Sequence, residues 1–194
     1  MHKLFATVGI VGLIVLSGPA LGDAAQHMAV CTGCHGADGV TSPMPDVPII
    51  AGIDAVVQED ALFAYRDGAR QCGPPAVMCQ ISAALSDDDI AELAAHFAEL
   101  PNKPAGEDFD AALAAEGEKI HKKDCGICHG MDGPVMPEAS ILHGQKMAYL
   151  RFVMQQYAAG TRDQLPPMQA TISALTPEQT EAILNYYASY RGAP

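Results

Sequence analysis

Two segments of the chain carry apolar residues at helical spacing, each directly after a residue suited to cap a helix. Ser86 precedes three aspartates, whose charges favour a helix N-terminus, and Thr176 precedes Pro177 and a capping-box glutamine, Gln179. The apolar positions that follow are Ile90, Leu93, Ala94 and Phe97 in the first segment and Ile183, Leu184 and Tyr187 in the second. This spacing predicts two closing helices, one in each half of the chain.

The rest of the pattern predicts further helices, and strand signals are nearly absent. A helix over about 109–123 leads into "CGICHGMDG" (125–133), which repeats "CTGCHGADG" (31–39) at an offset of 94. Further landmarks recur in order: Tyr65, Gly68, Arg70, Pro74, Pro75 and Met78 correspond to Tyr157, Gly160, Arg162, Pro166, Pro167 and Met168. We expect an all-α protein of two similar units, each with a short helix, a cysteine turn, a Pro/Gly-rich loop, a middle helix, a methionine loop and a closing helix.

The first 22 residues predict a secretory signal peptide. Lys3 is followed by an apolar run over 4–16 and then by small residues up to Gly22. The apolar run is shorter than the about 20 residues that span a bilayer, so an uncleaved anchor is the less favoured alternative. We expect export to the periplasm, cleavage before Asp23 and at most peripheral association with a membrane.

The mature chain is long enough for two small domains. Between them, "LPNKPAGEDF" (100–109) contains two prolines and a glycine, a composition typical of a linker. We predict an N-terminal domain over 23–101, a linker over 102–108 and a C-terminal domain over 109–194.

The mature chain is strongly acidic. It carries 23 acidic residues, and one of the 11 basic residues, Lys3, is lost with the signal peptide. Phosphates would repel such a surface, which argues against a nucleic-acid partner, whereas a protein with a basic patch would be attracted to it. Solubility alone is an equally good explanation of the charge.

The repeated Cys-x-x-Cys-His unit is the attachment signature of c-type haem. In that chemistry the thiols of Cys31 and Cys34, and of Cys125 and Cys128, bond covalently to the porphyrin, and the next histidine, His35 or His129, binds iron. Two haems would also supply the apolar core that units with so few aromatic residues lack. A thioredoxin-like redox pair, which needs a βαβ setting, and a zinc site built from the four cysteines are the weaker alternatives.

Each haem iron then needs a second axial ligand. Met78 and Met168 are the best candidates, because they occupy matching points of the repeat and methionine sulfur is a common haem ligand that raises the reduction potential. The alternative role is that of methionines filling the core. Met44 and Met136 follow their histidines too closely. We interpret the remaining histidines, His27, His96, His121 and His143, as surface or packing residues.

At this level of detail the chain resembles the di-haem cytochrome c4 family. The resemblance is carried by "CTGCHGADG", "PIIAG", "YRDGAR" and "MCQISAALSDDDIAELAAHF", and by their counterparts "CGICHGMDG", "ILHGQ", "YAAGTR" and "MQATISALTPEQTEAILNYY". It implies two tandem class I cytochrome c domains related by pseudo-twofold symmetry, and a role in periplasmic electron transfer. "FDAALAAEGEKIHKKDCGICHG" and "ILHGQKMAYLRFVM" are also similar to the haem subunit of flavocytochrome c sulfide dehydrogenase.

The family also implies roles for residues around each haem. A proline carbonyl after each motif fixes the proximal histidine, and Pro48 matches this position in the first half. In the second half Ser140 stands there, so we expect His129 to be held less tightly. Arg70 and Arg162 are candidates to neutralise haem propionates, with exposed surface arginines as the alternative.

Cys72 and Cys79 lie outside the two haem motifs. In an oxidising compartment they are expected to form a disulfide beside Met78 that stiffens the approach of this ligand, and two buried thiols are the alternative.

No other motif in the chain indicates catalysis. The sequence therefore predicts a protein that is not an enzyme by itself. We expect it to transfer single electrons between redox proteins, either as a free carrier or as the haem subunit of a larger dehydrogenase. The partners expected from the resemblance are a flavoprotein subunit or a terminal oxidase. The alternative is a di-haem enzyme, of peroxidase or thiosulfate-oxidising type, in which one haem is open or unusually ligated.

Overall fold

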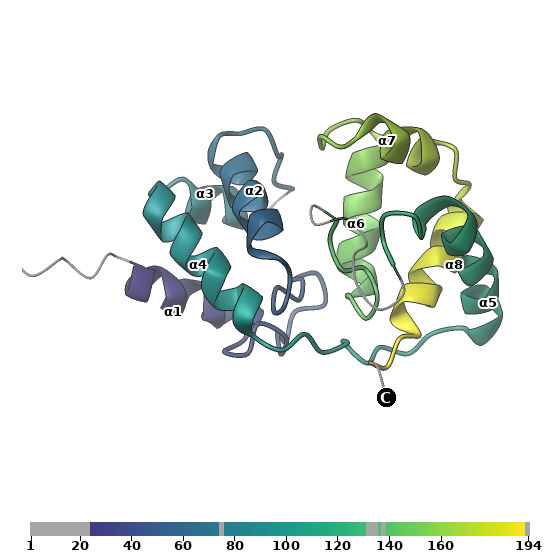
Figure 1. Cartoon of the computed structure of the whole chain (residues 1–194), viewed down its shortest axis with the longest axis horizontal. Helices are drawn as coiled ribbons and strands as arrows, with labels where there is room; N and C mark the ends of the chain where they lie inside the picture. The colour runs from purple at the N-terminus through teal and green to yellow at the C-terminus, as the bar shows by residue number, and fades with distance from the viewer. Residues whose placement is uncertain (1–23, 74–75, 131–135, 137–138, 193–194) are drawn as a thin grey trace, which may run out of the picture.

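The computed structural model describes residues 24–73, 76–130, 136 and 139–192, and these residues are all-helical apart from turns and loops. The first group of helices is α1 (Ala24–His35), α2 (Ala55–Arg66), α3 (Val77–Ser82) and α4 (Asp87–Glu99). The second group is α5 (Ala111–Ile120), the π-turn η1 (His121–Cys125), α6 (Met147–Ala158), α7 (Pro166–Ser173) and α8 (Pro177–Ala188). Figure 1 shows the two groups side by side, joined at one edge by an extended segment.

The two closing helices begin as the sequence predicts. Ser86 caps α4 through a reciprocal capping box with Asp89, and Thr176 caps α8 through one with Gln179. Both helices bury their apolar positions, among them Ile90 and Leu93 in α4. α4 packs on α2 and lightly on α1, whereas α8 packs most extensively on α5 and also on α6.

The methionine segments differ from the prediction. Met78 lies in α3 and Met168 in α7, so these segments are short helices, not loops. The helix expected over about 109–123 ends at Ile120, and its continuation into the second cysteine motif is the π-turn η1.

Equivalent glycines repeat the same contact in both groups. The N–H of Gly52 donates to the carbonyl of Phe97 (2.9 Å), and the N–H of Gly144 donates to the carbonyl of Tyr187 (2.8 Å). Both glycines have positive φ, +69° and +76°, which a residue with a side chain rarely adopts. Each loop is thereby fastened to the end of the closing helix of its own group.

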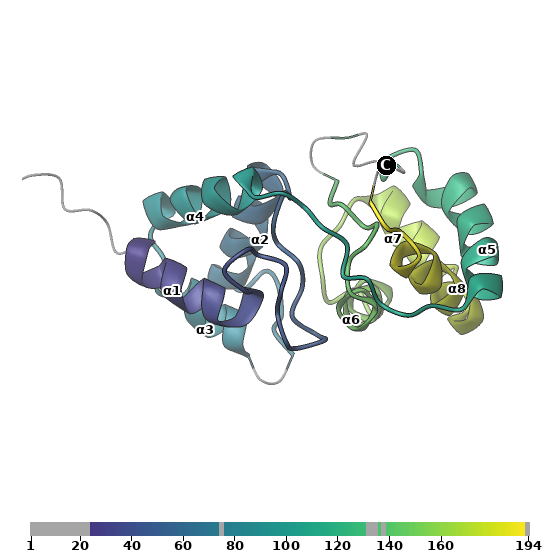
Figure 2. The same cartoon turned by 90° about the horizontal axis from the view of Figure 1, so that it is seen from below.

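Residues 101–110 between α4 and α5 form no helix or strand and lie against both groups. Asn102 donates to the carbonyl of Ala51 (2.8 Å), and the N–H of Ala105 donates to the carbonyl of Gly144 (2.8 Å). Figure 2 shows this segment running from one group to the other.

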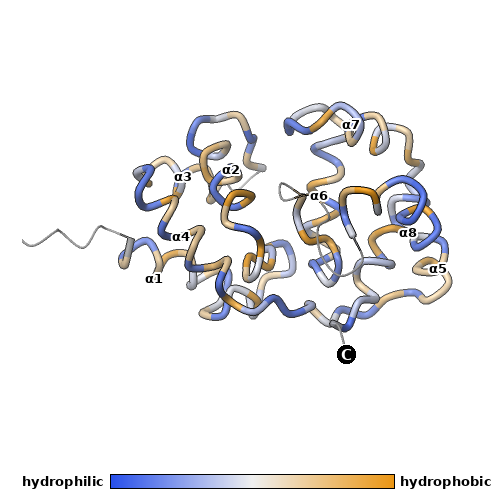
Figure 3. Tube along the Cα trace, in the orientation of Figure 1, coloured by the Kyte–Doolittle hydropathy of each residue, from blue (hydrophilic) through white to orange (hydrophobic). Residues whose placement is uncertain are grey.

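No described helix is long and apolar enough to cross a membrane. Figure 3 shows polar and apolar stretches alternating along both groups of helices. The predicted signal peptide, 1–22, lies outside the described residues.

Candidate functional site

The first cysteine motif forms the end of α1. Cys31 and Cys34 are half-buried and carry free thiols, and α1 ends at His35. The chain turns at once, because Gly36 adopts a φ of +85°. The helix therefore presents two thiols and one imidazole from consecutive turns.

His35 is held in one orientation. Its side chain is buried, and Nδ1 donates a hydrogen bond to the carbonyl of Pro48 (2.9 Å). Burial lowers the pKa of His35; the hydrogen bond to Pro48 raises it and the charge of Lys146 lowers it, and the net effect is downward. The imidazole is thus neutral at pH 7, with Nε2 as the nitrogen that can bind a metal.

His129 is held in the same way. Its Nδ1 donates to the carbonyl of Ser140 (3.0 Å), and burial lowers its pKa. The expectation that Ser140 would hold His129 less tightly is wrong in this respect. The acceptor is a backbone carbonyl, which serine provides as well as proline does.

The turn before the second motif packs around a fully buried histidine. A hydrogen bond joins Nδ1 of His121 to the hydroxyl of Tyr187 (3.1 Å), and the ring of His143 packs edge-on against His121. His121 precedes Cys125 by four residues, as His27 precedes Cys31, so the two positions are equivalent. The sequence interpretation overlooked this match, which the spacing alone would have given.

The proposed distal ligands occupy equivalent short helices. Met78 in α3 and Met168 in α7 are both half-buried. A cavity of about 390 Å³ lies between α7 and the turn before the second motif, lined by Lys123, Asp124, Ala170, Thr171, Ala174, Leu175 and Gln179.

A disulfide joins Cys72 to Cys79, immediately beside Met78. The loop that it closes includes 74–75, which lie outside the described residues. Gly73, in the same loop, lies against the second group of helices: a Cβ built on it would sit 3.0 Å from the ring of Phe152 in α6.

The two arginines expected to neutralise haem propionates each lie over a tyrosine ring. The guanidinium of Arg70 lies over the ring of Tyr65 (4.8 Å to the centroid), and that of Arg162 over the ring of Tyr157 (5.0 Å). Arg162 is buried, and its Nε and Nη1 have no hydrogen-bond partner in the described part of the chain. An acidic group of a cofactor would complement this buried positive charge and accept hydrogen bonds from its two free donors.

Gln145 and Lys146, which the sequence interpretation did not single out, join the two halves. Gln145 pairs with the backbone of Ile49, and Nζ of Lys146 donates to the carbonyls of Ser42 (3.0 Å) and Met44 (2.8 Å). Both residues are buried. The sequence did contain a signal for this pair. Two polar residues follow Gly144, whereas isoleucine, Ile53, follows the equivalent Gly52.

The donor groups fit one c-type haem in each half. Each half has two free thiols followed by a histidine whose Nδ1 is engaged by a carbonyl, the arrangement that leaves Nε2 for iron. The described residues contain no cluster of three or more Cys, His, Asp or Glu side chains that could hold a metal ion. In this part of the chain the four motif cysteines are thus not gathered into one such cluster.

Curated relatives match this chain over most of its length. It is 32% identical over 180 residues to the thiosulfate dehydrogenase electron acceptor of Stutzerimonas stutzeri, covering 87% of this chain and 82% of the relative. It is 31% identical over 197 residues to cytochrome c4 of Pseudomonas aeruginosa, covering 95% and 94%. The chain belongs to the cytochrome c4 family.

Family and structure comparisons agree with this assignment. The family model of cytochrome c oxidase, cbb3-type, subunit III, matches residues 112–186. The structure of cytochrome c4 from Acidithiobacillus ferrooxidans superposes with a TM-score of 0.73 at 28% identity, covering 84% of this chain and 99% of that one. Thiosulfate dehydrogenase (TsdBA) from Marichromatium purpuratum matches with a TM-score of 0.69 at 26% identity, covering 82% of this chain and 36% of that chain.

The predicted fold class and family are therefore confirmed: the chain has the cytochrome c4 architecture of two tandem class I cytochrome c domains. It is a cytochrome c4-like electron carrier, and the two Cys-x-x-Cys-His motifs imply two c-type haems. Its partners are redox proteins, as for the electron carriers that it resembles.

Proposed function

We propose that this member of the cytochrome c4 family carries single electrons in the periplasm through two c-type haems, one that would be ligated by His35 and Met78 and the other by His129 and Met168. The observation that carries the proposal is the matched pair of hydrogen bonds from His35 to Pro48 and from His129 to Ser140. When bound, each haem supplies a one-electron ferric/ferrous couple.

The chain's own residues position and tune that couple. The carbonyls of Pro48 and Ser140 fix the proximal rings and increase their basicity as ligands. Arg162, and Arg70 at the equivalent place, provide permanent positive charge for the propionates. With one histidine and one methionine holding each iron, no coordination position would be left for a substrate, and the chain would transfer electrons without catalysing a reaction of its own.

A sulfur-oxidising enzyme is the donor that best suits the chain. One relative is named for accepting electrons from thiosulfate dehydrogenase, and a thiosulfate dehydrogenase structure contains a region similar to this chain. The resemblance to the haem subunit of flavocytochrome c sulfide dehydrogenase offers a flavoprotein subunit as an alternative donor, and a terminal oxidase is a suitable acceptor. Purification at native expression levels, with the mass of any bound partner, separates a free carrier from a subunit.

Replacing the distal ligands tests the coordination. We expect the mature protein to carry the mass of two haems and not to bind carbon monoxide when reduced. Met78→Ala and Met168→Ala should each open one haem to carbon monoxide and lower the potential of that haem only, because the soft sulfur ligand is lost. Met44→Ala is the matched control, since Met44 is exposed and should leave both haems unchanged.

The enzyme alternative makes the opposite prediction. Binding of carbon monoxide to the unmodified reduced protein would show that one haem is open and would favour a peroxidase or a thiosulfate-oxidising catalyst. If neither methionine variant binds carbon monoxide in the reduced state, Met78 and Met168 are ruled out as ligands.

A further inference from the structure

One peptide group in the first half carries hydrogen bonds at both ends. Its carbonyl, on Pro48, accepts Nδ1–H of His35 (2.9 Å). Its N–H, on Ile49, donates to Oε1 of Gln145 (2.9 Å), which belongs to the second half of the chain. The proximal histidine of the first motif is therefore linked to the second half through a single peptide plane.

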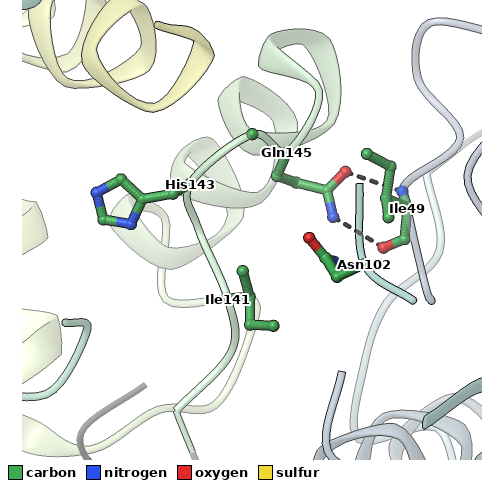
Figure 4. Close-up of a pocket in the computed structure, with 6 residues that line it drawn as sticks. Ile49, Asn102, Ile141, His143 and Gln145 are labelled. Atoms are coloured by element: carbon green, nitrogen blue, oxygen red, sulfur yellow. Dashed lines mark hydrogen bonds between the residues drawn. The ribbon is translucent and has the colours of Figure 1, made fainter. Parts of the chain in front are cut away.

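The amide of Gln145 is fixed in this position. Its Nε2 donates to the carbonyl of Ile49 (2.8 Å), and its Oε1 also accepts the N–H of Lys146 (3.0 Å). Figure 4 shows Gln145 reaching across to Ile49 with both hydrogen bonds, while His143 points the other way. Gln145 and Ile49 are buried. Burial makes these hydrogen bonds costly to lose, because water cannot replace the partners.

Lys146 anchors the same loop from a second point. Its Nζ donates to the carbonyls of Ser42 and Met44, which lie upstream of Pro48 in the loop that follows the first motif. The loop that positions the Pro48 carbonyl is thus held at two places by consecutive residues of the second half.

Among the described residues, no side chain of the first half makes the equivalent contact to the peptide that holds His129. Gly52 and Gly144 are equivalent, so the residue that corresponds to Gln145 is Ile53. An isoleucine side chain has no group that can accept the N–H of Ile141, the peptide whose carbonyl holds His129. The link therefore acts on the first histidine only.

We propose that Gln145 is a positioning residue that sets the ligand strength of His35, and hence the potential of the first haem, from the second domain. A peptide whose N–H is hydrogen-bonded has a more polarised carbonyl, which is a stronger acceptor for Nδ1–H of His35. A stronger acceptor makes the imidazole a more basic ligand and favours the ferric state. The inference rests on the coordination by His35 and Met78 proposed above.

Gln145→Leu tests the link by removing both polar groups while keeping a side chain of similar size. The reduction potential of the first haem should rise. At a fixed solution potential, the ratio of reduced to oxidised first haem should increase three- to tenfold; a tenfold increase corresponds to a rise of ~59 mV for a one-electron couple. The second potential should not change. In the reduced protein, the proton resonance of His35 Nδ1–H should shift upfield as its hydrogen bond weakens, and that of His129 should stay in place.

Gln145→Glu is the conservative variant. It keeps an oxygen that can face the N–H of Ile49, so the first potential should stay at or below that of the unmodified protein. Gln156→Leu is the matched control, because Gln156 is also buried and its Nε2 donates across the same interface, to the carbonyl of Gln71 (2.9 Å). It removes a cross-interface hydrogen bond without touching the Pro48–Ile49 peptide, and it should leave the His35 resonance unchanged.

The direction of the shift separates this role from simple loosening of the interface. Water entering a loosened interface would favour the more charged ferric haem and so lower the reduction potential of the first haem. A lower first potential in the Gln145→Leu variant therefore overturns the proposal. Equal shifts in Gln145→Leu and Gln156→Leu also overturn it. Should the leucine variant fail to mature, Gln145→Met removes the same polar groups with an unbranched side chain and is read in the same way. Carbon monoxide binding and the absorption spectra test the haem ligands independently, so failure of the coordination proposal is distinguishable from failure of this one.

Discussion

At the scale of single residues, the Cys72–Cys79 disulfide acts beside one proposed ligand only. It closes a short loop whose second cysteine directly follows Met78, and the second half has no cysteine outside its haem motif. The loop also packs against Phe152 of the second half through Gly73. The disulfide therefore constrains the segment that carries Met78 in α3, whereas α7 carries Met168 without such a constraint.

The double substitution Cys72→Ser and Cys79→Ser should destabilise the first domain by about 2.5 kcal/mol, because an open loop of this length gains conformational entropy in the unfolded chain. Because the segment is then more mobile, Met78 should be bound to the iron for a smaller fraction of the time, and the reduction potential of the first haem should fall. Denaturant titration and spectroelectrochemistry measure the two effects. An unchanged first potential would show that the disulfide stabilises the fold without tuning the haem.

At the scale of the elements, α5 and α8 cross at Gly117. A Cβ built on Gly117 would fall inside contact distance of the carbonyl of Ala182 and only 2.8 Å from Cβ of Tyr186. The two backbones touch here, so this glycine sets the separation of the two helices. The same crossing brings Tyr187 to His121, beside the second haem motif.

Gly117→Ala should therefore destabilise the second domain by about 3 kcal/mol, the upper end of the usual cost of overpacking. Helix propensity alone would predict a gain of up to about 1 kcal/mol, so the sign of the effect decides between the two influences. Thermal or denaturant unfolding of the two-haem protein gives the measurement.

Ala115→Gly is the matched control, because Ala115 is exposed in the same helix and its substitution changes helix propensity without adding bulk against α8. This variant should cost about 1 kcal/mol or less. A loss of stability in Gly117→Ala no larger than that in Ala115→Gly would contradict the role assigned to the crossing of α5 and α8.

The sequence predicted the starts of the closing helices but not the turn η1, because the first depend on local contacts and the second on a distant one. Ser86 and Thr176 marked the starts of α4 and α8, because a cap is a local interaction between residues three apart. The turn η1 was not predicted. It depends on packing of His121 against Tyr187, 66 residues away, and no local pattern records that contact.

At the scale of the whole molecule, negative charge is concentrated in the first half. Residues 23–100 contain twelve acidic residues and only two basic ones, Arg66 and Arg70, whereas residues 101–194 contain eleven acidic and eight basic residues. A partner with a basic docking surface should therefore approach the first half preferentially, since electrostatic steering acts before contact.

The double substitution Asp88→Asn and Glu92→Gln, on the exposed surface of α4, should slow electron exchange with a basic cytochrome c about two- to threefold at low salt. The difference should vanish near 1 M salt, where the Debye length is about 3 Å. Stopped-flow kinetics over a range of ionic strength provide the test.

The control removes two exposed charges from the second half by Asp108→Asn and Asp163→Asn. It should have a smaller effect on the rate at low salt. If both pairs of substitutions slow the reaction equally, docking is not biased toward the first half.

The sequence by itself determined the two cysteine motifs, their repeat, the capped closing helices and the family, because each of these is written in residues close together along the chain. Pairing of Cys72 with Cys79 was also expected, and the structure contains this bond. The domain limits, the signal peptide and the two methionine ligands remain predictions.

Only the tertiary structure decided how the halves act on each other. Gln145 meets Ile49 across a sequence separation of 96 residues, and Lys146 meets Ser42 and Met44 across more than 100. Such contacts depend on how two helical groups pack, and nothing in the local sequence around the first histidine indicates that its supporting peptide is held from the other domain.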